Sequence, residues 1–277
     1  MKKYKIQKDS VQETLIIPLY GRKQAMDMYP DLFDDTDCQI LLDNIEYGFK
    51  KTNMIKSKIG AIMAAIRKYD MVSVCNEYLK DHPKACVVNL GCGLDSVFCQ
   101  VDNGTAKGYN LDFYDVIEMR NELLPLKNRE INLAVDLMDF SWFKKINYRL
   151  EDGIVFIASG VFYYFKQEDV KRLLSAMADY FKGGKIAFDA TNYIGLKSMA
   201  KTWLEPSKMK NINVYFSIED KEEIKNWNFG FLDVSCKGYL TGYRSLDKRF
   251  GFFTNLLFKY LDNSKRCQII EITFKGE

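Results

Sequence analysis

Glycines and acids in two short stretches are spaced as a cofactor site requires. One apolar run ends in Gly91 and Gly93, and the next apolar run ends in Asp112. A glycine lets the backbone approach a ligand because it has no Cβ. An acid at the end of the second strand can accept hydrogen bonds from ribose hydroxyls. We therefore expect an adenosine-bearing cofactor at the carboxyl ends of two neighbouring parallel strands.

The residues after the second glycine distinguish between cofactors. A dinucleotide fingerprint has a third glycine, where the pyrophosphate meets a helix N-terminus, but this chain has Ser96 there and Asp95 within the turn. The Asp95 carboxylate would repel a pyrophosphate, and it suits a cofactor with positive charge, such as S-adenosylmethionine. A nicotinamide-dependent oxidoreductase is thereby disfavoured. A tight strand-to-helix turn without any ligand remains the alternative.

Strand and helix patterns alternate through the middle of the chain. The predicted strands are Ala85–Leu90, Gly108–Asp112, Ile131–Val135, Ile154–Ala158 and Lys185–Asp189. The predicted helices are Ile59–Leu79, Leu94–Gln100, Tyr114–Leu123 and Gln167–Phe181. This alternation predicts an α/β fold with a mostly parallel sheet and helices on both faces.

The pattern changes after residue 191. Helices and loops are expected over 193–229, and two late strands over Phe231–Tyr239 and Cys267–Phe274. We expect these strands to form an antiparallel hairpin at one edge of the sheet. Between them lies an aromatic-rich segment, 240–262.

We interpret the chain as a single domain with three parts. Residues 1–60 are read as short helices and loops that form an N-terminal cap, 61–192 as the cofactor-binding core, and 193–277 as the remaining helices, a cap segment and the edge hairpin. The regions 15–55 and 240–262 are the candidate cover of the acceptor site.

Composition indicates an ordinary globular protein. The 277 residues are 47% hydrophobic and 28% charged, and the net charge of +3 gives little support to nucleic-acid binding. No apolar run reaches the length of a membrane span, and no signal peptide is evident. Seven cysteines without C-x-x-C pairs predict a reducing, cytoplasmic setting and no structural metal. The oligomeric state is left open.

Several blocks in order resemble the leucine carboxyl methyltransferase-like O-methyltransferases, in particular the bacterial branch similar to the tetracenomycin polyketide O-methyltransferase. The resemblance covers roughly residues 13–190, and the C-terminal third carries none of it. The blocks are residues 13–22, 67–70, 87–95, 111–120 and 159–165.

The resemblance implies a Rossmann-like methyltransferase sheet, S-adenosylmethionine as methyl donor, and a hydroxyl or carboxylate of a small molecule as acceptor. It implies that Arg67 pairs with the methionyl carboxylate and that Asp112 holds the ribose. Asp136 and Leu137 would frame the adenine, although Asp136 could equally be a helix N-cap. The other implied cofactor-site residues are Gly91, Gly93, Asp95, Phe113, Ser159 and Gly160.

Two departures from the family pattern affect these expectations. Ser159 stands where the family commonly has glutamate, and residues 96–100 lack the usual threonine and arginine. A relative that binds the cofactor with reduced or lost catalysis therefore remains an alternative. Methylation of a protein's C-terminal carboxylate is another.

The acceptor chemistry leaves few candidates for a base. Methyl transfer from a sulfonium mainly requires alignment, and only a hydroxyl acceptor would benefit from proton removal. The single histidine, His82, is expected at the surface, away from the chemistry. Tyr163 and Tyr164 are the candidate catalytic residues, and strand alternation would send them to opposite sides. Both could equally be packing aromatics.

Overall fold

A computed structural model of the chain describes residues 3–6, 11–47, 57–201, 213–228 and 230–276. Its α-helices are α1 (Val11–Met28), α2 (Thr36–Asn44), α3 (Lys58–Asp81), α4 (Val97–Val101), α5 (Tyr114–Leu123), α6 (Gln167–Tyr180), α7 (Tyr193–Met199), α9 (Lys221–Lys225) and α10 (Phe252–Asn263). Its strands are β1 (Tyr4–Lys5), β2 (Ile45–Glu46), β3 (Cys86–Leu90), β4 (Lys107–Asp112), β5 (Glu130–Ala134), β6 (Ile154–Ala158), β7 (Lys185–Ala190), β8 (Phe231–Gly238) and β9 (Gln268–Phe274). Three short 3₁₀ turns are η3 (Phe140–Lys145), η4 (Phe162–Tyr164) and η6 (Lys248–Phe250).

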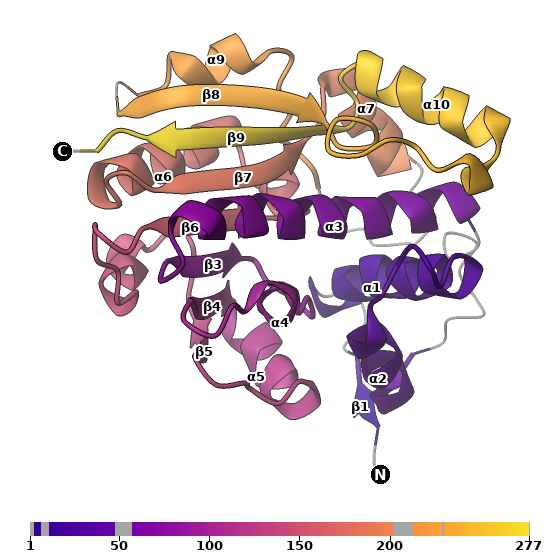
Figure 1. Cartoon of the computed structure of the whole chain (residues 1–277), viewed down its shortest axis with the longest axis horizontal. Coiled ribbons are helices and arrows are strands. Elements are labelled where there is room, and N and C mark those ends of the chain that lie inside the picture. The colour runs from indigo at the N-terminus through magenta and orange to yellow at the C-terminus, as the bar shows by residue number, and fades with distance from the viewer. Residues whose placement is uncertain (1–2, 7–10, 48–56, 202–212, 229, 277) are drawn as a thin grey trace.

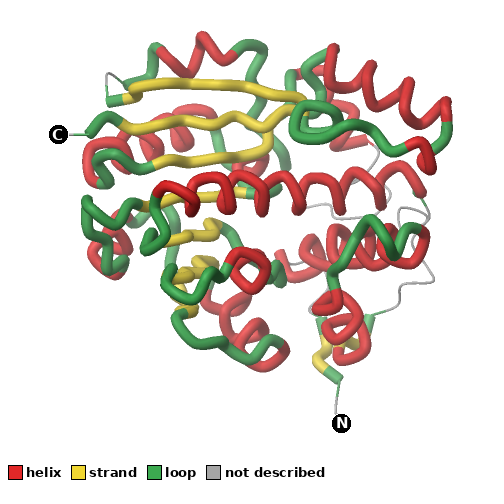
Figure 2. Tube along the Cα trace, in the orientation of Figure 1, coloured by secondary structure: helices red, strands yellow, loops and turns green. Residues whose placement is uncertain are grey.

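The centre of the molecule is a seven-stranded sheet with the order β5-β4-β3-β6-β7-β9-β8 (Figure 1). The first five strands in this order are parallel, and β9 runs antiparallel to both β7 and β8. Figure 2 shows the strands enclosed by helices and loops. The predicted fold class, including the antiparallel edge hairpin, is confirmed. Each predicted strand also agrees with an observed one to within one residue at either end.

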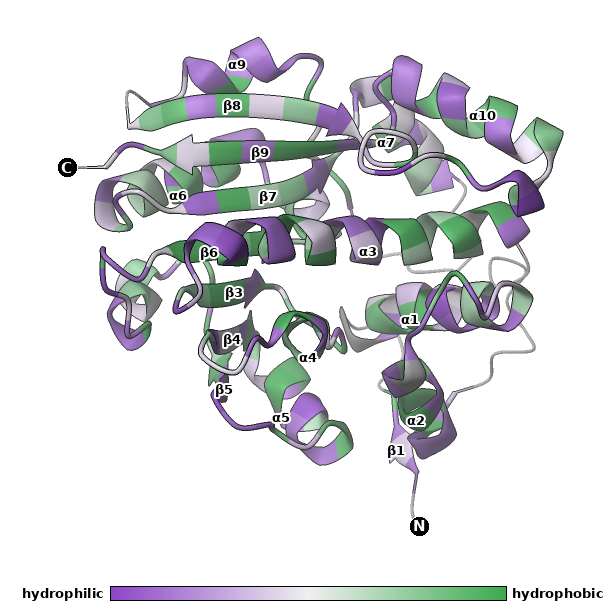
Figure 3. Cartoon of the chain, in the orientation of Figure 1, coloured by the Kyte–Doolittle hydropathy of each residue, from purple (hydrophilic) through white to green (hydrophobic). Residues whose placement is uncertain are grey.

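The central strands are apolar because helices cover both of their faces. Every residue of β3 and β6 is buried, as parallel strands with two covered faces require, and both strands are largely coloured as hydrophobic in Figure 3. Alternate side chains enter separate cores. Val87 and Val155 pack in the core that contains α3, whereas Val88 and Phe156 pack in the core that contains α6.

The N-terminal region differs from the prediction of short helices. α1 is a continuous helix of 18 residues with Pro18 inside it. A proline inside a helix removes one backbone hydrogen bond, but Ile16 and Leu19 on this helix are fully buried. Gly21 also allows close approach to α3, since a Cβ there would lie 3.3 Å from that of Ala64. Tertiary packing thus maintains the helix through the proline.

The helix predicted over Leu94–Gln100 begins later, at Val97. The Asp95 N–H donates to the Cys92 carbonyl in a tight turn, and this turn uses the residues that were expected to form the first part of the helix. Part of the segment 193–229 lies outside the described residues, and the rest forms α7, α9 and loop as predicted. The three-part division of the chain stays a prediction.

The aromatic-rich segment 240–262 folds into η6 and most of α10. Phe250 and Phe258 are buried in the core that includes α3, whereas Phe252 and Phe253 are exposed. This segment lies beside α3, at the same end of the sheet as α1 (Figure 1). No helix within the described ranges is long and apolar enough to cross a membrane.

Candidate functional site

A cleft opens between α1, α3 and the loop that follows β3. It lies at the carboxyl end of that strand, where the glycine pattern predicted a cofactor. Its lining residues are Leu15, Pro18, Arg22, Ala64, Arg67, Lys68, Asn89, Gly91, Cys92, Gly93, Leu94, Asp95 and Ser159.

The two glycines of the loop are required by its conformation. Gly91 has a φ of 58° and Gly93 a φ of 50°, in the left-handed region that favours glycine. A Cβ on Gly91 would lie 2.6 Å from a methyl group of Val161, and one on Gly93 would lie 2.8 Å from a methyl group of Leu15. Glycine is therefore needed at both positions for the close packing of the loop, and both residues line the cleft.

Asp112 fixes this loop from the neighbouring strand. Its Oδ2 accepts a hydrogen bond from the Gly93 N–H at 2.8 Å, and its Oδ1 accepts one from the Phe113 N–H at 2.8 Å. The side chain is 8% exposed, and burial raises the pKa of the carboxyl, although both N–H groups act to lower it. The predicted acid thus lies against the glycine turn at the end of β4.

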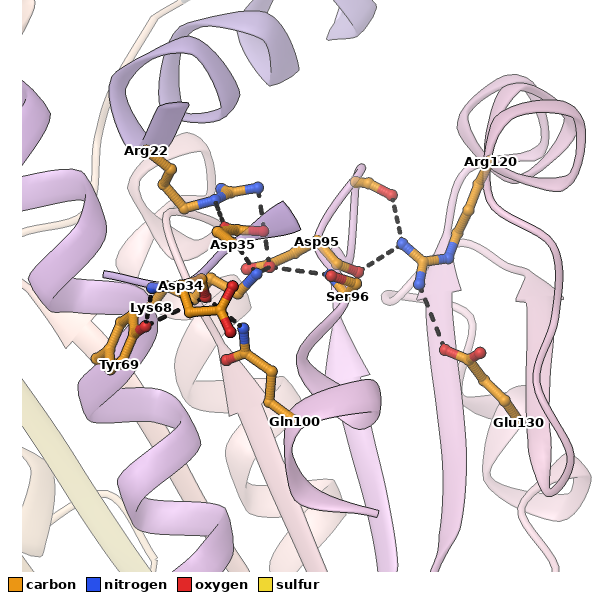
Figure 4. A network of polar contacts seen from close by, with 11 residues as sticks. Arg22, Asp34, Asp35, Lys68, Tyr69, Asp95, Ser96, Gln100, Arg120 and Glu130 are labelled. Atoms are coloured by element: carbon orange, nitrogen blue, oxygen red, sulfur yellow. Dashed lines mark hydrogen bonds and ion pairs between the residues drawn. The ribbon is translucent and has the colours of Figure 1, made fainter. Parts of the chain in front are cut away.

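A buried arginine holds the same loop from the other side. Arg120 on α5 donates to the Gly93 carbonyl at 3.1 Å and to the Asp95 carbonyl at 2.6 Å. Its guanidinium also pairs with Glu130 at 3.5 Å, and both side chains are almost fully buried. Figure 4 shows Arg120 reaching the loop from the side opposite to Lys68. The backbone of the turn is therefore fixed by hydrogen bonds on both sides.

The Asp95 carboxylate belongs to a buried network of four charges (Figure 4). Lys68 lies 3.2 Å from Asp95 and 2.8 Å from Asp35. Arg22 lies 2.8 Å from Asp35 and 3.9 Å from Asp95. The charge that was predicted to suit a cationic cofactor is thus already balanced within the protein, and Asp95 joins the glycine loop to α1 and α3.

The charges in this network support one another. Burial alone would raise the pKa of Asp35, but Arg22 and Lys68 hold it at about 2. Burial also opposes ionisation of Asp95, whose pKa is nevertheless lowered by Lys68 and Arg22. Lys68 keeps a raised pKa in spite of its burial because of Asp95 and Asp35. All four groups are charged at neutral pH, and their charges sum to zero.

Arg67 lines the cleft and pairs with a buried carboxylate at the end of β7. Its Nη1 donates to Asp189 Oδ2 at 2.8 Å, and 21% of its side chain is exposed. The guanidinium lies against Gly160, where a Cβ would be 3.2 Å from Nη2. Gly160 has a φ of 75° and also donates its N–H to Asp189. The structure therefore brings two predicted cofactor-site residues, Arg67 and Gly160, together around a carboxylate that was not predicted.

The two tyrosines occupy unequal positions. The expectation that they alternate along a strand is wrong, because Phe162–Tyr164 is a 3₁₀ turn. Tyr163 is buried and donates to Asp189 Oδ2 at 3.0 Å. Burial and then Asp189 raise the pKa of its hydroxyl well above the usual value. Tyr164 is 40% exposed, and it is the one of the two that is open to an incoming molecule.

Two further residues of the cleft bear on ligand binding. Ser159 lines it just after β6, where the resemblance would have placed glutamate. Asn89 is 5% exposed, and within the described parts of the chain its Nδ2 has no hydrogen-bond partner. A buried donor without a partner is costly, so Asn89 is suited to donate to a ligand in the cleft.

The remaining predicted residues lie beside the cleft rather than in its lining. Phe113 is 45% exposed at the end of β4, next to Asp112. The Val135 N–H donates to the Asp112 carbonyl, which places the exposed Asp136 near the same edge. Leu137 is buried in the main core. Asp136 accepts from the Met138 N–H but caps no helix, because the cap of η3 is Asp139.

His82 lies far from these residues along the fold. It ends α3 and precedes β3, so it sits at the amino end of the strand whose carboxyl end carries the glycine loop. Its ring stacks on Tyr78 at 4.5 Å, and it is half-buried rather than fully at the surface.

Several residues of the site were missed because their roles depend on tertiary pairing. These are Arg22, Asp35, Lys68, Arg120 and Asp189. A usable signal existed for Asp189, since it is an acid at the end of an apolar strand, as Asp112 is. Arg22, Lys68 and Arg120 lie within blocks that resemble the family, but no local pattern gave these side chains a role, and no signal marks Asp35.

The residues of the cleft fit S-adenosylmethionine better than a metal ion. Bare backbone at Gly91 and Gly93, the Arg67 guanidinium, and the unpartnered Asn89 amide are the kinds of groups that an adenosyl amino acid requires. In the described ranges no group of three or more histidine, cysteine, aspartate or glutamate side chains could hold a metal. All seven cysteines are free.

Comparisons with known proteins agree with this fit. The family model described as leucine carboxyl methyltransferase matches residues 23–178. The tetracenomycin polyketide synthesis O-methyltransferase TcmP of Streptomyces glaucescens is 26% identical over 181 residues. That match covers 65% of this chain and 66% of the relative, so it spans just under two thirds of the relative's length.

Solved structures share the fold. A putative methyltransferase from Thermobifida fusca has a TM-score of 0.58 and 13% identity, covering 78% of this chain and 83% of its own. The plantazolicin methyltransferase BpumL, solved with S-adenosylhomocysteine (SAH), has a TM-score of 0.52 and 13% identity, covering 96% and 99%. At these identities the likeness establishes the architecture of the sheet and its helices.

Proposed function

We propose that this chain, which belongs to the leucine carboxyl methyltransferase family, is an S-adenosylmethionine-dependent methyltransferase and that it methylates a hydroxyl or carboxylate oxygen of a small molecule. The observation that carries the proposal is the glycine loop held against Asp112 at the carboxyl end of the sheet. The similarity to an O-methyltransferase of polyketide synthesis supports oxygen as the acceptor atom and a small molecule as the substrate.

The residues that would hold the cofactor follow from the cleft. Arg67 would bind the methionyl carboxylate, Asn89 would donate to the same part of the ligand, and Asp112 would accept from the ribose hydroxyls. Phe113 and Asp136 would lie on the adenine side, at the ends of β4 and β5. Bound S-adenosylmethionine supplies a methyl group that is already electrophilic because it is attached to a sulfonium sulfur.

The protein's task is then to align the acceptor and to exclude water. Holding two reactants in line is a large part of the acceleration that an enzyme can provide. A carboxylate acceptor needs no base, whereas a hydroxyl acceptor must lose its proton. Tyr164 is the exposed side chain at the turn after β6, and we propose that it faces the acceptor. His82 lies at the amino end of β3, whereas the cleft lies at the carboxyl end, and this separation argues against a histidine base.

The test is methyl transfer from S-adenosylmethionine that carries a radiolabelled methyl group. Candidate acceptors are a phenolic polyketide, an aliphatic carboxylic acid, and a peptide that ends in leucine with a free carboxylate. Alkali separates the products, because a methyl ester releases volatile methanol whereas an aryl methyl ether does not. Asp112→Ala serves as the binding-deficient control. Label in the phenol or the small acid would support the proposal.

Two other outcomes decide against it. Label in the peptide alone would assign the enzyme to C-terminal carboxyl methylation of proteins. Cofactor binding without transfer to any acceptor in a broad panel of phenols and acids would favour a binding protein that has lost catalysis, an alternative that Ser159 keeps open.

A further inference from the structure

We propose that Asp189 is a positioning residue for the methyl-transfer site: it orients Arg67 toward the cofactor cleft and fixes the turn that presents Tyr164. This inference rests on the proposed role of Arg67 in binding the cofactor. It assigns a function to a buried carboxylate at the end of β7 to which neither the sequence analysis nor the comparisons give a role.

The Asp189 carboxylate is buried, and both of its oxygens accept hydrogen bonds. Its side chain is 1% exposed. Oδ2 accepts from Arg67 at 2.8 Å and from the Tyr163 hydroxyl at 3.0 Å, and Oδ1 accepts from the Gly160 N–H. Ordinary packing would not require a charge here, because a buried charge is costly unless it is paired.

The pairing determines which part of Arg67 remains available. Nη1 is committed to Asp189, and the flat face of the guanidinium rests on Gly160. Arg67 nevertheless lines the cleft, so its other N–H groups can meet an anionic ligand. A guanidinium fixed on one side by a carboxylate presents its remaining donors in a defined direction. Without Asp189 the long side chain would lose this constraint.

Asp189 also lies next to Ser159, the uncharged residue that follows β6. In the β6–β7 pair Ala158 is opposite Phe188, so the following residues, Ser159 and Asp189, are neighbours across the two strands. Ser159 lines the cleft without a charge. The carboxylate of this corner of the site is therefore supplied from β7 rather than from the residue after β6.

The same carboxylate reaches the acceptor side through the 3₁₀ turn. It accepts hydrogen bonds from the backbone N–H of Gly160, just before the turn, and from the hydroxyl of Tyr163 within the turn. Tyr164 follows and is exposed, and the charges of both Arg67 and Asp189 act on its hydroxyl. One buried anion thus links the predicted carboxylate-binding arginine to the residue proposed to face the acceptor.

The experiment is a double-mutant cycle on cofactor affinity. S-adenosylmethionine is titrated calorimetrically into the wild type, Arg67→Ala, Asp189→Asn and the double variant. Asparagine keeps the shape of aspartate and one acceptor oxygen but removes the charge. We expect Asp189→Asn to raise the Kd about ten-fold, as the loss of a charge-assisted interaction does. If Asp189 acts through Arg67, the double variant should bind hardly more weakly than Arg67→Ala alone.

Two further variants separate positioning from general stability. Asp152→Asn is the matched control, because Asp152 is also a buried carboxylate paired with an arginine, Arg149, but lies before the amino end of β6, away from the cleft. The Kd of this variant should equal that of the wild type. Asp189→Asn combined with Ser159→Asp returns the charge to the adjacent strand and should recover part of the affinity. Tyr163→Phe should alter kcat more than the Kd of the cofactor.

The outcomes distinguish this inference from the proposed function. If the wild type binds S-adenosylmethionine and Arg67→Ala weakens it, but Asp189→Asn has no effect or acts additively with Arg67→Ala, the inference is wrong and the function stands. If the wild type does not bind the cofactor at all, the proposed function fails and the inference fails with it.

Discussion

Lys68 of α3 and Asp95 of the glycine loop form an ion pair in the interior of the protein, with 3.2 Å between Nζ and Oδ1. Lys68 follows Arg67 directly, but the two side chains have different partners. Arg67 lines the cleft toward Asp189, whereas Lys68 joins the loop and Asp35. The following residues, Tyr69 and Asp70, contact Asp34 and Arg244. Four consecutive residues of one helix therefore tie four segments together.

Lys68→Met should destabilise the fold strongly. The change leaves Asp35 and Asp95 buried with only Arg22 as a counterion, and breaking a buried pair costs about 3–5 kcal/mol. Urea unfolding of the purified variant measures the loss. The control is Lys23→Met, because Lys23 forms an i,i+4 pair with the exposed Asp27 that is worth about 0.3–0.5 kcal/mol. Equal losses in the two variants would contradict the importance given to the network.

Asp112→Ala should weaken binding of S-adenosylmethionine about 10–100-fold. The variant loses the proposed ribose acceptor, and the Gly93 N–H loses its partner. Asp102→Ala is a suitable comparison, since Asp102 also accepts from a glycine N–H but lies in an exposed turn. Calorimetric titration of both variants checks the expectation. An unchanged Kd for Asp112→Ala would remove Asp112 from the site.

Gly91→Ala should cost more stability than Gly104→Ala. Both glycines have a positive φ, which costs alanine about 1 kcal/mol. Only at Gly91 would the new Cβ collide with Val161, whereas nothing lies within 4 Å at Gly104. We expect about 1 kcal/mol for Gly104→Ala and about 2–4 kcal/mol for Gly91→Ala. Chemical denaturation compares them, and the reverse order would show that the loop is not tightly packed.

Asp70 should make stability fall as the pH rises from about 4 to 7. Burial raises the pKa of Asp70 from 3.8 to about 7, although Arg244 acts to lower it, and Asp262 raises it further. In this window the folded state holds a proton that the unfolded chain has released, so increasing pH favours unfolding.

Asp70→Asn removes the titrating carboxyl, so this contribution to the pH dependence of the free energy of unfolding is lost. The variant should match the wild type near pH 4 and exceed its free energy of unfolding near pH 8, by on the order of 1–4 kcal/mol. Denaturation curves at several pH values provide the test. A wild type that is relatively more stable than the variant at pH 8 would show that Arg244 keeps Asp70 ionised.

The sheet could be predicted because its strands carry a strong local signal. Apolar runs such as those of β3 and β6 are bounded by glycine turns, and their order along the chain fixes the parallel core. α1 could not be predicted, because its continuity through Pro18 depends on the packing of Ile16 and Leu19 in the folded protein. The expectation that proline ends a helix considers only the local sequence, and it does not include the stabilisation that comes from burying these side chains.

The candidate site was predictable where backbone conformation or strand position fixed a residue. Gly91, Gly93 and Asp112 are of this kind, and they lie together as expected. Strand alternation was extended to Tyr163 and Tyr164, which follow the predicted strand, because a hydropathy pattern does not mark the 3₁₀ turn that contains them. Arg22 and Lys68 look like surface cations in the sequence, and only their burial against Asp35 and Asp95 reveals their role.

The wall that α1 contributes to the cleft has a consequence for shortened versions of the chain. Leu15, Pro18 and Arg22 all lie before residue 23, where the family match begins, and Asp189 lies beyond residue 178, where it ends. A fragment trimmed to the matched span would keep the glycine loop but lose one side of the cleft and the carboxylate that orients Arg67. We therefore expect the smallest portion that can hold the cofactor to be larger than the portion by which the family is identified.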